Sequence, residues 1–264
     1  MSARPRLWVV KLGSGLLTAQ SGKIDQTQIN QLVAQISAIR KNGVQVVLVS
    51  SGAVSAGMTA LELPKRPKSR TALQACATIG QSDLINAYQK ALRRHGMIAA
   101  QILLTYWDLD SRKIYENTQS TLKYLLRLKN CLPIVNENDA ISFDELEMLN
   151  RFGDNDRLSA HVAQMLKAKQ LIILSGIDGL YTSLDKEGIL LKEVHQIDEK
   201  IKSYAGQTKS QRSVGGMISK LETAKMMMKA KIPMVIANGR HKGILEKLAQ
   251  GEKWGTRFSA ANKS

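Results

Sequence analysis

The chain has 264 residues, 44% of them hydrophobic, and a formal net charge of +16 at pH 7. This length and apolar content suffice for a full hydrophobic core in one large domain or in two tightly joined ones. No apolar run approaches the length of about 18 residues that a membrane span needs, so no membrane partner is expected. The positive charge would attract nucleic acid, anionic membranes or small acidic metabolites. Because only 5% of the residues are aromatic and bases stack on aromatic rings, nucleic-acid binding is not expected as the main function.

Cysteine usage and the N-terminus both bear on the compartment. Cys76 and Cys131 lie in apolar contexts without paired spacing, which predicts reduced thiols in the core of a cytoplasmic protein. The four histidines are scattered, so their spacing predicts no metal site. The N-terminus begins with basic residues as a signal peptide does, but Lys11 interrupts the apolar stretch too early for one. We therefore expect residues 7–12 to form a strand.

Apolar runs of strand length alternate along the chain with patterns of helix length. The expected strands are residues 7–12, 44–49, 98–104, 132–135, 171–174 and 234–237. The expected helices are residues 26–41, 71–94, 114–128, 156–168, 217–230 and 243–249. A hairpin is expected at 142–150, and the polar, glycine-flanked residues 205–216 are expected to form a surface loop rather than a mobile lid. This alternation predicts a three-layer α/β/α sandwich around a mostly parallel central sheet.

Polar or glycine-rich turns follow five of the predicted strands, at the edge where open α/β sheets bind ligands. They are residues 11–15, 50–53, 136–139, 175–179 and 238–239. Lys11 ends an apolar strand, where its ammonium is costly unless it meets an anion or reaches solvent. Gly13 and Gly15 would let backbone N–H groups approach a phosphate, although a tight turn is the simpler explanation. Neither GxGxxG nor a Walker motif is present, which excludes a Rossmann or P-loop site.

Three further segments have both a structural and a functional explanation. Gly215 and Gly216 would form a turn that opens the helix at 217–230, with Lys220 one turn inside; this can hold a phosphate, or Lys220 can be an ordinary surface residue. Residues 136–139 are either a plain turn or a pocket for the charged groups of an amino acid. Ser51 either caps the helix that follows it or offers a hydroxyl to an anion.

The most informative stretch is residues 151–160, which places Asp154, Asn155 and Asp156 on a glycine-led turn before a predicted helix. These side chains can cap the helix or organise cations and polar ligands. Neither Glu nor Gln stands three residues after Asp154, so there is no capping box. Lysines, glycine turns and carboxylates in this combination suit phosphoryl transfer, in which catalysis is mostly positioning and neutralisation of charge.

Six segments, in this order, resemble the glutamate 5-kinases of the amino acid kinase fold family. They are VVKLGS (9–14), VSSGAVSAG (49–57), PIVNENDA (133–140), GDNDRLSA (153–160), DGLYT (178–182) and GGM (215–217) followed by Lys220. The likeness runs from about residue 7 to residue 258. It implies one amino acid kinase domain over residues 1–258 and a short tail at 259–264. The PUA domain that many members carry at the C-terminus, an RNA-binding-like module, is not expected.

The resemblance implies ATP-dependent phosphorylation of the γ-carboxylate of L-glutamate, the first step of proline synthesis. By this likeness, Lys11 and Lys220 stabilise the transferring phosphoryl group, and Asp156 holds both lysines in place. The positions that match the glutamate site, or lie close to it, are Ser51, Asp139, Asn155, Asp154 and Asn136.

The resemblance also places ATP over two turns, with Mg²⁺ bridging its phosphates. The matching positions are Lys11, Gly13, Ser175, Gly176, Val214, Gly215, Gly216, Met217, Ile218, Ser219 and Lys220. Gly176 stands where the family usually has Asp, and Val214 stands where Thr often precedes the two glycines. Relative to the family pattern, the chain lacks one nucleotide contact and one hydroxyl near the phosphates, which bears on its nucleotide preference.

Beyond its substrates, the family implies a homo-oligomer, feedback inhibition by proline, and hand-off of the product to glutamate-5-semialdehyde dehydrogenase. Two alternatives stay open at this point. One is another kinase of this fold, acting on aspartate, N-acetylglutamate or UMP. The other is a basic nucleic-acid-binding or regulatory protein that has lost catalysis, against which the presence of Lys11, Asp156 and Lys220 argues.

Overall fold

The computed structural model describes residues 6–19, 21–142, 155–183, 187–206 and 211–260. Its strands are β1 (Arg6–Leu12), β2 (Val44–Val49), β3 (Ile98–Leu104), β4 (Cys131–Glu137), β5 (Gln170–Ser175), β6 (Glu193–Val194), β7 (Met234–Asn238) and β8 (Thr256–Phe258). They form one eight-stranded sheet in the order β3-β4-β2-β1-β5-β7-β8-β6. Every pairing is parallel except that of β7 with β8. The carboxyl ends of β1, β2, β4, β5 and β7 therefore meet at one edge of the sheet.

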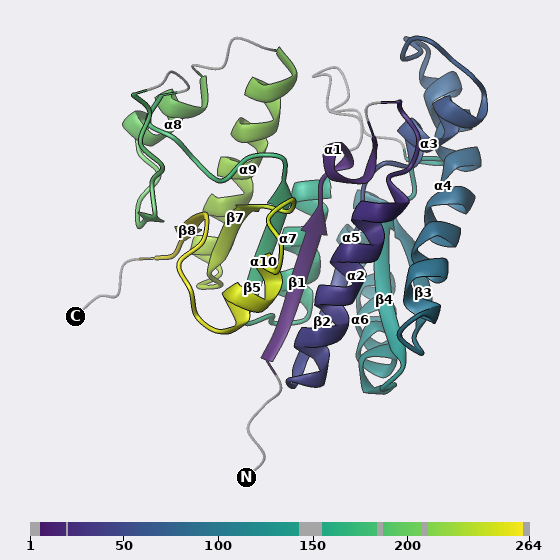
Figure 1. Ribbon diagram of the computed structural model, residues 1–264, viewed down its shortest axis with the longest axis horizontal. Coiled ribbons are helices and arrows are strands. Elements are labelled where there is room, and N and C mark those ends of the chain that lie inside the picture. Colours follow the sequence, from purple (N-terminus) through teal and green to yellow (C-terminus); the bar gives the residue numbers. More distant parts are fainter. Residues whose placement is uncertain (1–5, 20, 143–154, 184–186, 207–210, 261–264) are drawn as a thin grey trace.

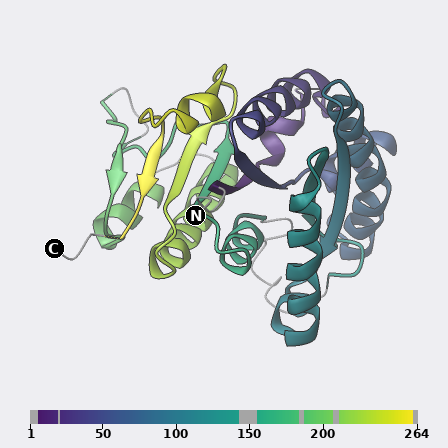
Figure 2. The ribbon, with the colours of Figure 1, turned by 90° about the horizontal axis from the view of Figure 1, so that it is seen from below.

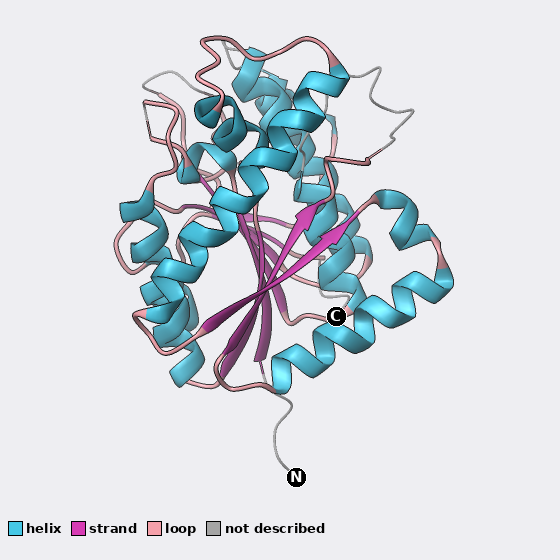
Figure 3. Cartoon of the chain, turned by 90° about the vertical axis from the view of Figure 1, so that its right-hand side faces the viewer, coloured by secondary structure: helices cyan, strands magenta, loops and turns pink. Residues whose placement is uncertain are grey.

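Helices cover both faces of this sheet (Figures 1 and 3). They are α1 (Ser14–Leu17), α2 (Gln26–Lys41), α3 (Ala53–Ala60), α4 (Arg70–Arg93), α5 (Tyr106–Asp110), α6 (Arg112–Arg127), α7 (Asn155–Met165), α8 (Glu199–Gly206), α9 (Gln211–Lys229) and α10 (Ile244–Ala249). The view from below shows helices on either side of the strands (Figure 2). The expected three-layer α/β/α sandwich with a mostly parallel sheet is confirmed.

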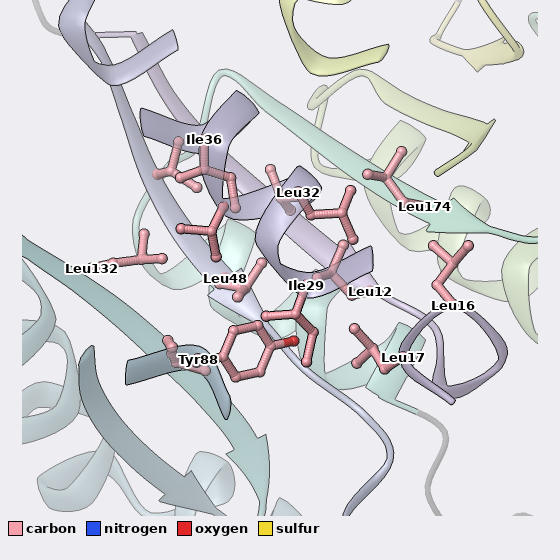
Figure 4. Close-up of a cluster of buried hydrophobic side chains, with 14 of the residues drawn as sticks. Leu12, Leu16, Leu17, Ile29, Leu32, Ile36, Leu48, Tyr88, Leu132 and Leu174 are labelled. Carbon is pink, nitrogen blue, oxygen red and sulfur yellow. The ribbon is translucent and has the colours of Figure 1, made fainter. Parts of the chain in front are cut away.

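Alternation along β1 separates two hydrophobic cores. Trp8, Val10 and Leu12 belong to the core that α2, α4 and α10 cover. Tyr88, Ile29 and Leu48 are among the buried side chains of that core (Figure 4). The intervening residues of β1 face the other core, which α6, α7 and α9 cover. Since successive strand side chains point to opposite faces, Lys11 faces the α7 and α9 layer.

One predicted turn is wrong. Helix α9 begins at Gln211, so Gly215 and Gly216 lie inside it and do not open it. Glycine costs about 1 kcal/mol in a helix interior, but burial of Met217 and Leu221 against the second core offsets that cost. The loop expected at 205–216 is likewise wrong at its ends, because α8 extends to Gly206 and α9 starts at Gln211. Residues 207–210 lie outside the described part of the chain.

The other boundaries differ in smaller ways. Strand β4 continues through Asn136 and Glu137, which were expected in a turn, because both pair with the end of β3. Gly13 is followed by the short helix α1 in place of the expected tight turn. Helix α7 ends at Met165, three residues earlier than predicted. The predicted hairpin at 142–150 falls almost wholly on residues 143–154, which are not described.

Two simpler expectations concern the thiols and the membrane. Cys76 and Cys131 are both buried and free, as predicted from their apolar contexts. Among the described helices, none combines the length and the apolar character that crossing a bilayer requires.

Candidate active site

Three charged side chains meet at the carboxyl edge of the sheet. Lys11 comes from the end of β1, Asp156 from the first turn of α7, and Lys220 from α9. The Nζ atom of Lys11 lies 2.7 Å from Oδ1 of Asp156, and the Nζ atom of Lys220 lies 3.1 Å from Oδ2. The three residues are almost fully buried, with exposed fractions of 5%, 1% and 9% for Lys11, Asp156 and Lys220. One carboxylate therefore bridges two ammonium groups, and the trio keeps a surplus positive charge that favours an anionic ligand.

The pKa of Asp156 shows that the bridge is ionic. Burial alone would raise the pKa of this carboxyl, but the charges of Lys11 and then Lys220 outweigh burial and hold it below its ordinary value. Asp156 is therefore ionised at neutral pH, and its two oxygens fix the positions of the two ammonium groups. Because Asp156 stands in the first turn of α7, the helix dipole also favours its negative charge.

Lys220 is held from a second direction. Its Nζ donates to the backbone oxygen of Gly216, one turn earlier in α9, across 3.1 Å. The site on α9 is therefore a helix side and not the helix start predicted from the glycines. Only the first four N–H groups of a helix lack partners within it, so the N–H groups of Met217 to Lys220 are not available to a phosphate.

A network of amide side chains lies beside the trio. The Nδ2 group of Asn155, the residue before Asp156, donates to the backbone oxygen of Ser50, to Oγ of Ser51 at 3.2 Å and to Oδ1 of Asn136 at 2.7 Å. These residues end β2 and β4 and begin α7. The structure thus brings together three of the predicted substrate residues: Ser51, Asn136 and Asn155.

The orientation of both amides is fixed by main-chain groups. The backbone N–H of Glu137 donates to Oδ1 of Asn136 at 3.0 Å, and an N–H can only donate, so this atom must be the oxygen. The Nδ2 group of Asn136 then donates to Oε1 of Gln81, on α4, at 2.6 Å. Asn155 faces the carbonyl of Ser50, which can only accept, so its Nδ2 must point there.

This orientation leaves one buried acceptor without a donor among the described residues. The Oδ1 atom of Asn155 is buried, and no hydrogen-bond donor reaches it from the described residues. A buried acceptor without a donor costs about 1–3 kcal/mol. A ligand that brings an N–H or O–H group to this atom recovers that cost.

Asp139 follows β4 and is 7% exposed. It lines a cavity of about 270 Å³ between the end of β4 and helix α4, together with Glu137 and Gln81. Because Gln81 also binds Asn136, the cavity adjoins the amide network. Asp154, the remaining predicted substrate residue, lies outside the described part of the chain.

The predicted nucleotide positions lie on two sides of the charged trio. Gly13 donates its N–H to the backbone oxygen of Leu174 at 3.0 Å, so the turn after β1 packs on the end of β5. The Oγ atom of Ser175, at that end, is buried without a hydrogen-bond partner among the described residues. A Cβ atom added to Gly176 would meet nothing within 4 Å. On α9, Met217 and Ser219 are buried and Ile218 is half-buried, while Val214 and Gly215 belong to the first turns of the helix.

Sequence reasoning missed two residues of α4 that support the site. Gln81 has no distinguishing signal, because a glutamine on an amphipathic helix looks like a surface residue. Tyr88 looks like core, and it is fully buried, but its hydroxyl lies 2.8 Å from Oγ of Ser50. Burial raises the pKa of Tyr88, so it keeps its proton and can donate to Ser50.

The sequence profile of the Amino acid kinase family matches residues 6–238 of this chain. The glutamate 5-kinase of Clostridium acetobutylicum is 42% identical over 97% of this chain and 95% of its own length. The glutamate 5-kinase of Clostridium perfringens is 42% identical over 96% of this chain and 94% of its own length. The chain belongs to the amino acid kinase family, among the glutamate 5-kinases. The glutamate 5-kinase of Dehalococcoides mccartyi is also 42% identical over 95% of this chain, which spans 67% of that longer relative.

Solved structures support the fold of this family member at low sequence identity. An isopentenyl phosphate kinase superposes with a TM-score of 0.66 and 16% identity, covering 95% of this chain and 99% of its own. The UMP kinase of Bacillus anthracis gives a TM-score of 0.63 and 16% identity, and the match covers 99% of this chain and 98% of the UMP kinase chain. At such identities the likeness establishes the shared fold alone.

Proposed function

We propose that this chain transfers the γ-phosphoryl group of ATP to the γ-carboxylate of L-glutamate, the first step of proline synthesis. Membership among the glutamate 5-kinases supports the substrates. The observation that carries the catalytic assignment is the buried Lys11–Asp156–Lys220 trio beside the amide network. It provides a positive centre for phosphate next to polar groups that suit an amino acid.

In the proposed reaction, an oxygen of the glutamate γ-carboxylate attacks the γ-phosphorus of ATP. The new C–O–P bond forms as the bond between the γ-phosphorus and the bridging oxygen breaks, and ADP leaves with the electron pair. The nucleophile is already ionised, so no general base is needed. Lys11 and Lys220 stabilise the negative charge on the transferring group, and Asp156 holds them in place without touching the substrate.

Glutamate would be recognised by the residues around the amide network. The Oδ1 atom of Asn155 and the carboxylate of Asp139 are acceptors suited to the substrate ammonium. Ser51 already accepts from Asn155, so its hydroxyl hydrogen can be donated to a substrate carboxylate. Asn136 acts through Asn155 and is a positioning residue in this assignment.

Mg²⁺ fits this site as a companion of the nucleotide. Both oxygens of Asp156 face lysines, and no group of three His, Cys, Asp or Glu side chains gathers within the described ranges. Mg²⁺ is commonly held by substrate phosphates and water with few protein ligands. When bound to the phosphates it would neutralise part of their charge.

Two subsidiary proposals follow, the first from this geometry and the second from the family. Proline carries the same α-carboxylate and a ring ammonium, so it would compete with glutamate for Asp139 and Asn155 and act as a feedback inhibitor. A homo-oligomer in the cytoplasm, with product passed to glutamate-5-semialdehyde dehydrogenase, would complete the role that the family implies.

The experiment that tests this function measures acyl phosphate formation with hydroxylamine present, which converts the product to a coloured hydroxamate. Glutamate, aspartate and N-acetylglutamate are compared as acceptors, and ADP release is measured with UMP. Hydroxamate is expected with glutamate and at much lower rates with the other carboxylates. A glutamate rate at the level of the acceptor-free control, with turnover of another acceptor, would overturn the assignment.

A further inference from the structure

A second cavity lies at the opposite edge of the sheet from the charged trio. It has a volume of about 710 Å³ and is bounded by the end of α2, the end of α6 and the turn after α4. This edge faces the viewer in Figure 2 and lies at the bottom of Figure 1, where β1 begins. Four cationic side chains line this cavity: Arg40, Lys41, Arg127 and Lys129. We call it the basic cavity. His95 also lines it.

The basic cavity has a net positive charge that its own walls do not neutralise. Among the described residues that line it, none is acidic, and none of the four cations takes part in an ion pair with another described residue. The C-termini of α2, α4 and α6 end at this edge, and each carries roughly half a negative charge from the helix dipole. Three such ends offset about 1.5 of the four positive charges, so about 2.5 remain.

The carbonyl groups at these helix ends do not need the remaining cations. At the end of α6, the Nε2 group of Gln45 donates to the backbone oxygen of Leu126. Arg40 donates to the backbone oxygens of Lys129, in the turn after α6, and Cys131, the first residue of β4. The backbone oxygens of residues 39 and 40 accept from the N–H groups of residues 42 and 43. Main-chain acceptors between α6 and β4 therefore account for Arg40, whereas Lys41, Arg127 and Lys129 have exposed charges and no partner among the described residues.

We propose that the basic cavity binds a compact anion that carries two or more phosphate groups. An anion with at least two charges matches the surplus, and a guanidinium and two ammonium groups are suited to phosphate oxygens. The volume is within the range of about 300–1,000 Å³ that is usual for small-ligand sites. A concave, bounded site of this kind suits a small molecule better than a nucleic-acid strand. The net charge of the chain is +16, and phosphorylation of glutamate does not require so large a positive charge. An anion-binding site in the basic cavity would account for part of it.

The test uses inorganic tripolyphosphate as the probe and isothermal titration of three proteins. They are the unaltered chain, a cavity variant (Lys41→Ala, Arg127→Ala and Lys129→Ala) and a control variant with the same loss of charge (Lys65→Ala, Lys113→Ala and Lys200→Ala). All six side chains are exposed, and the control residues lie outside both sites. The unaltered chain should show one class of binding at the catalytic trio and a second at the basic cavity.

In the cavity variant, the affinity of the second class of binding sites for tripolyphosphate should fall roughly tenfold or more. In the control variant, this affinity should stay unchanged. Hydroxamate formation should stay within about twofold in both variants, which shows that they are folded. Equal binding by the cavity and control variants would overturn the proposal. It would also be overturned if a short single-stranded oligonucleotide bound at the cavity and tripolyphosphate failed to displace it, since the ligand would then be nucleic acid.

Discussion

Asn155 is joined to Asn136 by a hydrogen bond of 2.7 Å from its Nδ2 to the Oδ1 of Asn136. This bond links the start of α7 to the end of β4, and Gln81 of α4 supports it from behind. Because main-chain groups fix both amides, the Oδ1 of Asn155 is held in one place, without a donor among the described residues. The residues that present the substrate acceptor are therefore positioned by elements far apart in the chain.

Gln81→Ala should loosen this arrangement without touching the phosphoryl group. Removing the acceptor leaves Nδ2 of Asn136 without its partner on α4 and weakens the support of the amide pair, so the KM for glutamate should rise roughly threefold to tenfold, the worth of one hydrogen bond. The kcat should change much less. Steady-state hydroxamate kinetics measure the two separately.

Gln81→Glu keeps an oxygen acceptor and should restore most of the lost KM. Gln74→Ala, on the same helix, is the matched control, because Gln74 binds the backbone of Ser142 and not the amide network. If Gln81→Ala left the KM unchanged, Gln81 would have no positioning role.

Lys11→Ala and Lys220→Ala should each act mainly on kcat. Loss of one charge at the transferring group is expected to lower kcat roughly a hundredfold to a thousandfold. Lys225→Ala is the control: it lies on the same helix as Lys220 but forms an exposed pair with Glu222. Near-normal turnover in both site variants would contradict the roles assigned to the two lysines.

The charge of Asp156 should appear in the pH dependence of stability. Its pKa is depressed below the ordinary value of 3.8, so its ionised form contributes stability that is complete above that value. This contribution is lost as the pH falls through the lower pKa of the folded state. Asp156→Asn should therefore cost about 3–5 kcal/mol of unfolding free energy near neutral pH, because two lysines stay buried without their partner.

Urea unfolding of both proteins across the acid range measures this difference. The gap between them should be constant near neutral pH and should shrink below about pH 4. If the difference in unfolding free energy stayed constant down to the lowest pH, the pKa of Asp156 would not be lowered by folding.

Gly176 offers a test of one of the two nucleotide positions where the chain departs from the family pattern. An added Cβ meets nothing within 4 Å, so Gly176→Asp should change the unfolding free energy by less than about 0.5 kcal/mol. If an Asp there contacts the nucleotide, the KM for ATP should fall by roughly threefold to tenfold.

Gly179→Ala is the contrasting control for stability. The φ angle of Gly179 is +157°, and a Cβ there would lie 2.4 Å from Oγ1 of Thr256. This substitution should be clearly destabilising in the same urea experiment. Equal effects of the two substitutions would show that the space around Gly176 is not open.

Periodicity made much of the fold predictable. Leu7 to Leu12 alternate between two cores, and Lys11 is the one charged residue within that stretch, which is why its need for an anion could be stated from sequence. The partner of Lys11 could not be found by spacing, because Asp156 is brought to it by the sheet topology. The role of Asp156 was predicted from the family likeness alone.

Other features had no usable signal. Gly215 and Gly216 indicate a turn by composition, but tertiary burial of the following turn of α9 keeps them helical. Gln81 became part of the site only because α4 packs beside the end of β4. Strands as short as β6 and β8 contain too few residues for a period to be recognised.

The most direct measurement follows the oxygen that forms the new bond. Glutamate labelled with ¹⁸O in its γ-carboxylate is incubated with ATP, the protein and hydroxylamine, and the released phosphate is analysed by mass spectrometry. Attack by the γ-carboxylate makes one of its oxygens the C–O–P bridge, and hydroxylamine then releases phosphate that retains it. Phosphate with one ¹⁸O atom, formed by the unaltered chain and almost absent with Lys220→Ala, is the predicted result. Phosphate without the label would contradict phosphoryl transfer to glutamate.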